Sequence, residues 1–445
     1  MGAQVFRDFK KSYPVIVRGK GPYLYDREGR EYLDAVGGIS VVNIGHGVEE
    51  VIAAMRAQAE RVAFVHGGAF ANEPAMALAE ELARWAPAGM DKVLLLSGGS
   101  EATETAMKLA FQYHLERGKA SKYRIISRWT SYHGNTIGSL SMSGRTAWRR
   151  LFAPQLLHFP KIHPPYCYRC PYGQSYPSCK IACAEDLERT ITFEGPESIA
   201  AFIAEPVIGT SAAGVTPPPE YYPRVREICD KHDVLFIADE VITGVGRTGR
   251  NFGIEHWGVV PDIITTAKGL SSGYAPLAAV ILHEKVYGAI VKGSGQTTQG
   301  FTFSGHPLCC TVGLAVLKYL KEHQLVENAA RIGKFMLERL TSLKRFPIVG
   351  DVRGLGMLQG VEFVADQATK RPFPAEVGVT RRIVEGALAE GVMIVPGMSG
   401  MIDGALGDHI QISPPFVFTE ANVEQLVGAV EKAIQKVMRE LPARA

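Results

Sequence analysis

Short apolar runs alternate with longer amphipathic stretches along the middle of the chain. From about residue 91 the pattern repeats as an apolar run, a glycine-containing turn, and a stretch whose apolar residues recur every three or four positions. The runs predict strands at 91–96, 123–127, 202–205, 235–239, 261–268 and 277–282. The stretches predict helices at 101–115, 219–231, 307–323 and 326–343. Strands that are joined through helices usually run parallel, so the sequence predicts an α/β fold with a mostly parallel central sheet.

Both ends of the chain have a different pattern. Residues 14–47 predict short strands and turns, followed by helices at 48–62 and 73–85. Near the C-terminus the predicted strands are 357–364, 392–395 and 409–413, and the predicted helices are 376–390 and 420–439. This mixture predicts a second, smaller α/β unit.

Composition and charge exclude several classes of function. The chain has 445 residues, 46% of them hydrophobic, and a net charge of +3 with both signs interspersed, so neither a nucleic-acid footprint nor a polybasic membrane patch is expected. The most apolar segment, 199–215, contains Glu205, Pro206 and Gly209 and does not predict a membrane span. The first residues lack the apolar region of a signal peptide, so we expect a cytoplasmic protein without a membrane partner.

A lysine and an aspartate follow two of the predicted strands. Asp239 ends the run from Leu235, and Lys268 ends the run from Pro261. The carboxyl ends of buried parallel strands open onto the active site of an α/β sheet, so these side chains are expected to lie close together. The pair suits pyridoxal 5'-phosphate (PLP), because the lysine can hold its aldehyde as a Schiff base and the aspartate can keep its pyridine nitrogen protonated. A solvated loop lysine and a helix-capping aspartate are the structural alternatives.

Two turns add further candidates. Ser97–Glu101 joins a strand to a helix, where glycines and free N–H groups favour an anion and Ser100 adds a hydroxyl. The turn matches neither a Walker loop nor G-x-G-x-x-G, which disfavours a nucleotide. Ser131–Gly134 follows another strand, and the ring of Tyr132 there can stack on a flat heterocycle or pack in the core.

Four of the seven cysteines gather in one loop rich in proline and tyrosine, with the spacing C-x2-C-x8-C-x3-C. They are Cys167, Cys170, Cys179 and Cys183. The spacing is compatible with a tetrahedral structural zinc site or with free or paired thiols, and we assign no catalytic metal. Cys229, Cys309 and Cys310 are expected in or near the core.

Six segments together resemble one family. GGSEATETA, SYHG, AEPV, ADEVITGVGRTG, PDIITTAKGL and GFTFSGHP are similar, in this order, to the class III (ω-) aminotransferases of PLP fold type I. The resemblance covers roughly residues 25–440. It implies a large PLP-binding domain, residues 61–340, and a small α/β domain formed by residues 1–60 and 341–445. It also implies a homodimer, or a dimer of dimers, with active sites at the subunit interface.

The resemblance assigns roles to individual residues. Catalytic roles fall to Lys268, Asp239 and Tyr132. The implied cofactor-binding residues are Gly99, Ser100, Tyr132, His133, Glu205, Asp239, Val241, Lys268 and Thr302. Gly99 and Ser100 would contact the phosphate, and Thr302 would reach the phosphate of the neighbouring subunit's cofactor. The two faces of the cofactor ring would meet Tyr132 and Val241.

Two positions depart from many family members. Gln411 stands where an arginine is expected to bind an α-carboxylate, and Ile242 stands where glutamine is common. Both departures resemble the branch that transfers amino groups from amines and ω-amino acids to pyruvate. Arg145, Arg149 or Arg150 could supply the missing charge, although a solvated basic helix face is the preferred interpretation of these three.

The implied function is PLP-dependent transamination from a small amine donor to a keto acid, with pyruvate the expected acceptor. A PLP-dependent lyase, decarboxylase or racemase on the same fold is the alternative enzyme class. A non-catalytic PLP-binding protein is a further alternative, which the presence of Lys268, Asp239 and Tyr132 disfavours.

Overall fold

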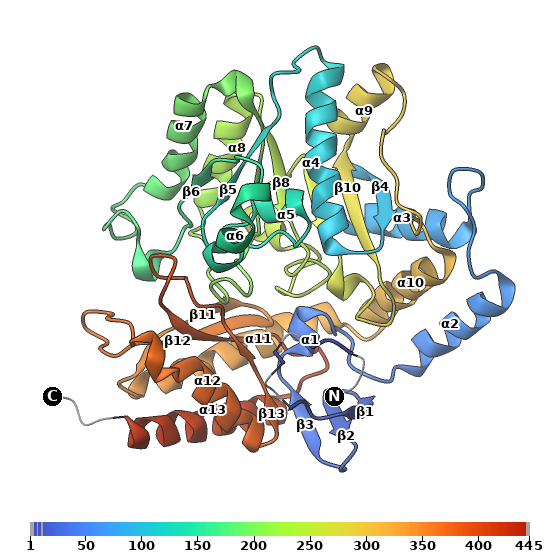
Figure 1. Cartoon of the computed structure of the whole chain (residues 1–445). Helices are drawn as coiled ribbons and strands as arrows, with labels where there is room; N and C mark the ends of the chain where they lie inside the picture. The colour runs from blue at the N-terminus through green and yellow to red at the C-terminus, as the bar shows by residue number, and fades with distance from the viewer. Residues whose placement is uncertain (1–3, 7, 10–11, 442–445) are drawn as a thin grey trace.

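The computed structural model describes residues 4–6, 8–9 and 12–441 of the chain. Figure 1 shows a central sheet with helices packed on it, and the N-terminal strands and the C-terminal elements lying below this sheet. The sheet has seven strands in the order β4-β10-β9-β8-β7-β5-β6. Their bounds are β4 Met90–Leu96, β5 Arg124–Arg128, β6 Lys161–Ile162, β7 Ile199–Ala204, β8 Leu235–Asp239, β9 Ile263–Thr266 and β10 Ala278–His283.

The central sheet is mostly parallel, as predicted. Neighbouring strands from β6 through β5, β7 and β8 to β9 all pair in parallel. Only β10 runs against its neighbours, β4 on one side and β9 on the other. The carboxyl ends of the parallel strands therefore meet along one edge, where polar side chains can converge.

Alternate residues of the inner strands serve two separate layers of the core. In β7, Ala201 and Ile203 belong to the apolar cluster that includes Leu109, whereas Phe202 and Ala204 belong to the cluster on the other face. Every residue of β7, β8 and β9 is buried. Burial on both faces explains why these strands appear in the sequence as unbroken apolar runs.

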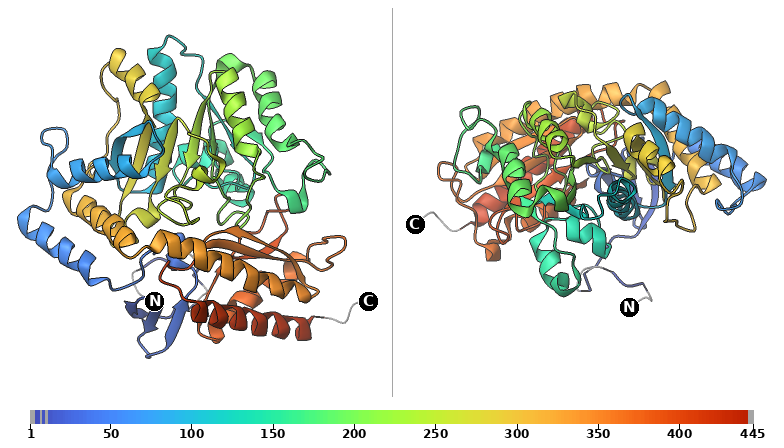
Figure 2. Two further views of the ribbon diagram at one scale, coloured as in Figure 1. Left: turned by 180° about the vertical axis from the view of Figure 1, so that it is seen from behind. Right: turned by 90° about the horizontal axis from the view of Figure 1, so that it is seen from above.

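Helices cover both faces of the sheet (Figure 2). The long helix α4 (Gly99–Glu116) contacts β7, β9 and β10 as well as α9 (Glu284–Lys292). On the other face α7 (Ala182–Glu194) packs against α8 (Tyr221–Lys231). The remaining helices of this part are α2 Glu49–Arg61, α3 Glu73–Trp85, α5 Ile137–Met142, α6 Thr146–Phe152, α10 Pro307–Glu322 and α11 Leu325–Thr341.

The two chain ends share one small sheet. Strand β13 (Val392–Met393) pairs in parallel with β3 (Glu31–Asp34), in the order β1-β2-β3-β13. A second sheet has the order β11-β12-β15-β14. The other elements of this part are β1 Ile16–Lys20, β2 Tyr23–Asp26, α1 Gly37–Ser40, β11 Val349–Leu355, β12 Leu358–Phe363, α12 Val379–Ala389, β14 Val395–Pro396, β15 Asp408–Ile412 and α13 Glu420–Glu440.

The domain boundaries after residues 60 and 340 stay predictions, and residues 1–3, 7, 10–11 and 442–445 of the two outer segments lie outside the described residues. In the part of the chain that the structure describes, no helix is both long and apolar enough to cross a membrane.

Candidate active site

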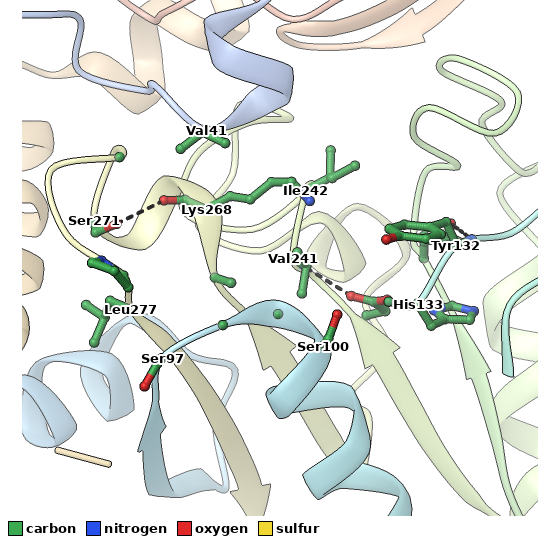
Figure 3. A pocket seen from close by; sticks show the side chains of 18 of the residues that line it. Val41, Ser97, Ser100, Tyr132, His133, Val241, Ile242, Lys268, Ser271 and Leu277 are labelled. Carbon is green, nitrogen blue, oxygen red and sulfur yellow. Dashed lines mark hydrogen bonds and ion pairs between the residues drawn. The ribbon is translucent and has the colours of Figure 1, made fainter. Parts of the chain in front are cut away.

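A pocket of about 330 Å³ opens at the carboxyl edge of the central sheet. The segments that follow β4, β5, β7, β8 and β9 each contribute to it, which brings together positions up to 180 residues apart, from Ser97 to Leu277. Figure 3 shows Lys268 reaching across this pocket toward Ile242, with Ser97 and Ser100 on one side and Tyr132 and His133 on another. Eight of the nine predicted cofactor-binding residues line the pocket: Gly99, Ser100, Tyr132, His133, Glu205, Asp239, Val241 and Lys268.

The carboxylate of Asp239 is buried and held by three donors. His133 Nδ1 donates to Oδ2 at 2.6 Å, while Thr265 Oγ1 and the Val241 N–H donate to Oδ1 at 3.2 Å each. Asp239 is the last residue of β8, and Thr265 belongs to the neighbouring strand β9. These contacts fix the carboxylate as an acceptor that points into the pocket, and they exclude the helix-cap alternative.

Lys268 lies at the end of a buried strand and is only half exposed. It follows β9 with φ at +41°, a left-handed backbone conformation that is uncommon outside glycine. Burial lowers the pKa of its amine to about 8; Asp239 and Glu205 oppose this shift, and the charge of Arg145 adds to it. A substantial fraction of the amine is therefore unprotonated near neutral pH, which suits a nucleophile or a proton acceptor.

Glu205, the residue after β7, is fixed by a buried arginine that the sequence analysis missed. Arg128 has no exposed surface, and its Nη2 donates to the backbone oxygen of Glu205 at 2.6 Å and to Oε2 at 3.2 Å. The other oxygen, Oε1, accepts from the Tyr132 N–H at 3.0 Å. The signal available in the sequence was an arginine at the end of a buried apolar run, because such a charge needs an internal partner.

The N-terminus of α4 fits an anion. Its N-cap residue, Gly98, provides no side-chain cap, and Gly98, Gly99 and Ser100 all line the pocket. A Cβ at Gly99 would lie 3.1 Å from Val241, so the backbone approaches the pocket wall more closely than a larger residue allows. Free N–H groups at the end of an 18-residue helix, together with the Ser100 hydroxyl, match the needs of a phosphate group.

Apolar side chains complete the pocket. Val241 and Ile242 follow Asp239, Val41 comes from the N-terminal segment, and Leu277 precedes β10. The sequence analysis assigned no role to Val41 or Leu277, since an apolar residue in a loop has no signal of its own. Asp239, the α4 end and the flat walls thus provide partners for the nitrogen, the phosphate and the ring faces of PLP, so the pocket fits this cofactor.

Two predicted substrate-site features lie elsewhere. Thr302 is exposed and does not line the pocket. Gln411 is fully buried in β15, where its Nε2 donates to Ser40 Oγ at 2.9 Å and Ser413 Oγ at 3.1 Å. The amide of Gln411 is therefore engaged in the core below α1 rather than exposed in the pocket.

The three arginines do not form one solvated face, so that interpretation is wrong for two of them. Arg150 is exposed, whereas Arg145 and Arg149 are half-buried. The Arg145 guanidinium lies 4.0 Å from the centre of the Tyr132 ring. The Arg149 guanidinium lies 5.3 Å from the centre of the Trp129 ring, and burial lowers its pKa. Aromatic residues far away in the sequence cover these side chains, which helix periodicity could not reveal.

The four loop cysteines surround a separate small cavity of about 20 Å³. Burial, with a contribution from the neighbouring thiols, raises the pKa of Cys183 to about 12. All seven cysteines are free, and Cys229 and Cys310 are buried as predicted. No group of three or more His, Cys, Asp or Glu side chains among the described residues is arranged to hold a metal ion, so a zinc site gains no support from the geometry.

The sheet topology and the pocket define a PLP-dependent enzyme of fold type I. The family model of the class III aminotransferases matches residues 7–434, and the chain belongs to this family. It is an aminotransferase that uses PLP.

Several relatives are similar over nearly their whole length. The uncharacterized aminotransferase YodT of Bacillus subtilis is 41% identical over 435 residues, which cover 98% of each chain. The diaminobutyrate--2-oxoglutarate transaminase of Halomonas elongata is 38% identical over 95% of this chain and 90% of its own.

Solved structures of the same fold include two transaminases. An (S)-enantioselective omega-transaminase from Thermomicrobium roseum is 38% identical with a TM-score of 0.91, covering 96% of this chain and 94% of its own. An amine transaminase from an uncultivated Pseudomonas species, solved in its PLP-bound form, is 36% identical with a TM-score of 0.91, covering 98% and 97%.

The lowered pKa of Lys268 predicts which lysine PLP attaches to and the pH at which it attaches. Borohydride reduction of the PLP-loaded protein, followed by peptide mapping, should place the label on Lys268. Labelling of the apoenzyme should be half-maximal near pH 8, because the protonated amine below this pH is not nucleophilic. Labelling of an ordinary lysine would be half-maximal only at a pH of about 10.4.

Lys161 provides an internal control for this measurement. Burial lowers the pKa of its amine to about 7, but the amine donates to Ser127 Oγ and Ser141 O and does not line the pocket. Lys268→Ala should fold and lose the label. A label on Lys161 would refute the assignment of Lys268.

Proposed function

We propose that the protein moves an amino group from an amine or an ω-amino acid to pyruvate, with PLP attached to Lys268. The observation that carries this proposal is the convergence of the Lys268 amine, the fixed Asp239 carboxylate and the uncapped end of α4 on one pocket. The names of the amine transaminase and omega-transaminase structures support the donor class. The 2-oxoglutarate-dependent relative makes 2-oxoglutarate the competing acceptor.

Different residues of the pocket would hold different parts of the cofactor. We assign the pyridine nitrogen to Asp239, the phosphate to the N-terminus of α4, and the two ring faces to Tyr132 and Val241. When bound, PLP acts as an electron sink for the negative charge that develops at the substrate carbon. His133 and Thr265 would keep the Asp239 carboxylate oriented, since both donate to it.

Lys268 would also move the substrate proton. Its pKa of about 8 lies near the working pH of most enzymes, where an amine can both accept and return a proton.

The wall of the pocket supports donors without a carboxylate on the reacting carbon. Val41, Ile242 and Leu277 are apolar, and no arginine is among the described residues that line the pocket. Gln411, at the position where the family resemblance expects an arginine, is turned toward Ser40 and Ser413. β15 thus lacks the bidentate arginine that usually selects α-amino acids, and the carboxylate of the alanine/pyruvate pair needs a partner from elsewhere.

We further propose a homodimer in which Thr302 completes the partner's phosphate site. Thr302 is exposed on the segment before α10. Three large apolar side chains in this region are also exposed: Phe303 at 57%, Phe70 at 68% and Phe64 at 39%. The rings of Phe64 and Phe303 are in contact. Exposed apolar surface of this kind is typical of a subunit contact.

The role of Asp239 predicts a large loss of turnover in Asp239→Asn. Removing one partner of a buried ion pair costs ~3–5 kcal/mol, which as a barrier change corresponds to at least about a hundredfold in kcat/KM. Thr265→Val removes one hydrogen bond to the same carboxylate and should cost only about two- to tenfold. Steady-state kinetics on both variants test the assignment; activity of Asp239→Asn within about tenfold of wild type contradicts it.

The apolar wall predicts the order of donors. With pyruvate as acceptor, a terminal amine and a β-amino acid should both have higher kcat/KM than glutamate, because the apolar wall offers no charged partner for the second carboxylate of glutamate, and a missing charge-assisted contact lowers affinity by ~1.5–3 kcal/mol. Repeating the panel with 2-oxoglutarate tests the acceptor. Glutamate as the best donor would refute the donor class, and faster turnover with 2-oxoglutarate would refute pyruvate.

A role of Thr302 in the partner's site predicts subunit complementation. Thr302→Ala alone should bind PLP more weakly, by about tenfold. Mixed with Lys268→Ala and reassociated, it should regain activity at limiting PLP, because one site of each heterodimer then combines an intact Lys268 with an intact Thr302. Thr298→Ala, an exposed threonine on the same segment, should bind PLP normally. An active monomer, or a mixture without recovery, would contradict the shared site.

A further inference from the structure

The keto-acid acceptor carries a carboxylate for which the pocket wall offers no arginine among the described residues. Gln411 is buried and already donates to two hydroxyl groups. A carboxylate that leaves water needs a charged or strongly hydrogen-bonding partner. The next layer around the pocket can supply such a partner.

Arg145 lies in that layer, packed against the ring of Tyr132. It precedes α6, and its guanidinium is 4.0 Å from the Tyr132 ring centre and 4.9 Å from the Trp148 ring centre. Its Nε donates to Ser211 Oγ at 3.1 Å. Two rings and one hydrogen bond thus restrict a side chain that would otherwise be mobile, and Tyr132 itself lines the pocket.

The charge of Arg145 acts on two titratable groups. One is the Lys268 amine, whose pKa is lowered first by burial and further by Arg145. The other is His409, on the same strand as Gln411; burial lowers its pKa to about 4, and Arg145 is among the charges that add to this shift. The Arg145 charge therefore acts on the Lys268 amine in the pocket and on His409 in β15.

We propose that Arg145 binds the carboxylate of the keto-acid acceptor, from the Tyr132 side of the pocket instead of from β15. This inference rests on the proposed function, because it names the group that recognises the acceptor. A guanidinium at this place favours acceptors with a carboxylate beside the carbonyl and contributes nothing to an aldehyde. Donors without a carboxylate on the reacting carbon do not need Arg145, so one pocket can serve an amine in one half-reaction and a keto acid in the other.

The test compares two three-carbon acceptors in the second half-reaction. Enzyme first loaded with amino groups from a terminal amine is mixed with pyruvate or with propanal, which lacks the carboxylate. In Arg145→Gln the apparent affinity for pyruvate should fall about 10- to 100-fold, and the rate with propanal should stay within about threefold. Arg150→Gln, at an exposed arginine in the helix that follows Arg145, should match wild type with both acceptors.

Two further variants keep the test informative if Arg145→Gln folds poorly. Arg145→Lys retains the charge without the planar fork and should lose less affinity for pyruvate than Arg145→Gln. Ser211→Ala removes the hydrogen bond that orients Nε and should give a smaller loss in the same direction. Labelling of Lys268 in the apoenzyme should shift to higher pH in Arg145→Gln, because a cation that lowers the pKa has been removed.

Inhibition by propionate separates this inference from the proposed function. Propionate has the carboxylate but no reactive carbonyl, so its inhibition constant in the propanal reaction reports on the carboxylate site whether or not pyruvate is a substrate. A wild-type enzyme that rejects pyruvate refutes the proposed acceptor. An inhibition constant that rises in Arg145→Gln still supports Arg145, and an unchanged constant overturns the inference. Equal losses with pyruvate and propanal also overturn it, since they indicate that Arg145 only supports Tyr132.

Discussion

The buried carboxylate of Asp239 constrains the whole active site. A carboxylate with almost no exposed surface must be surrounded by donors, and each donor comes from a different part of the sheet. His133 follows β5, Val241 follows β8, and Thr265 belongs to β9. The parallel pairing of these strands brings all three donors to one edge. Pocket geometry and sheet register therefore depend on each other, and a shift of one residue in β8 would turn the carboxylate into the core.

A second buried carboxylate, Glu205 after the neighbouring strand β7, is also held by donors from other parts of the sheet. Arg128 at the end of β5 holds Glu205 after β7, and Glu205 in turn orients the backbone at Tyr132. Neither side chain has appreciable exposure, so removing one partner would leave the other buried and unpaired. Tyr132 is thus held at its backbone N–H by Glu205 and at its ring by the guanidinium of Arg145. Both contacts restrain the segment that carries Tyr132.

Much of this arrangement was predictable from the sequence. The parallel strands are buried on both faces and appear as apolar runs, and the polar residue that ends each run marks the active-site edge. Helices without conventional start signals were missed. Helix α7 begins after Ile181 in a left-handed conformation, and α9 is capped by His283, whose side chain accepts from the Lys285 N–H. Arg145 was misjudged because its covering groups, Tyr132 and Ser211, are brought to it only by the tertiary fold. Sequence periodicity describes one element at a time and contains no information about such contacts.

The uncapped N-terminus of α4 couples the stability of the protein to the supply of its cofactor. A long helix that starts without a capping side chain leaves its first N–H groups to be satisfied by a ligand. Each subunit is then most resistant to unfolding when that ligand is plentiful, by an amount that grows with the logarithm of its concentration. When the cell has little PLP, the subunits without this cofactor unfold more often and are degraded first by proteases. Scarcity would thus remove idle copies of the enzyme without any dedicated regulator.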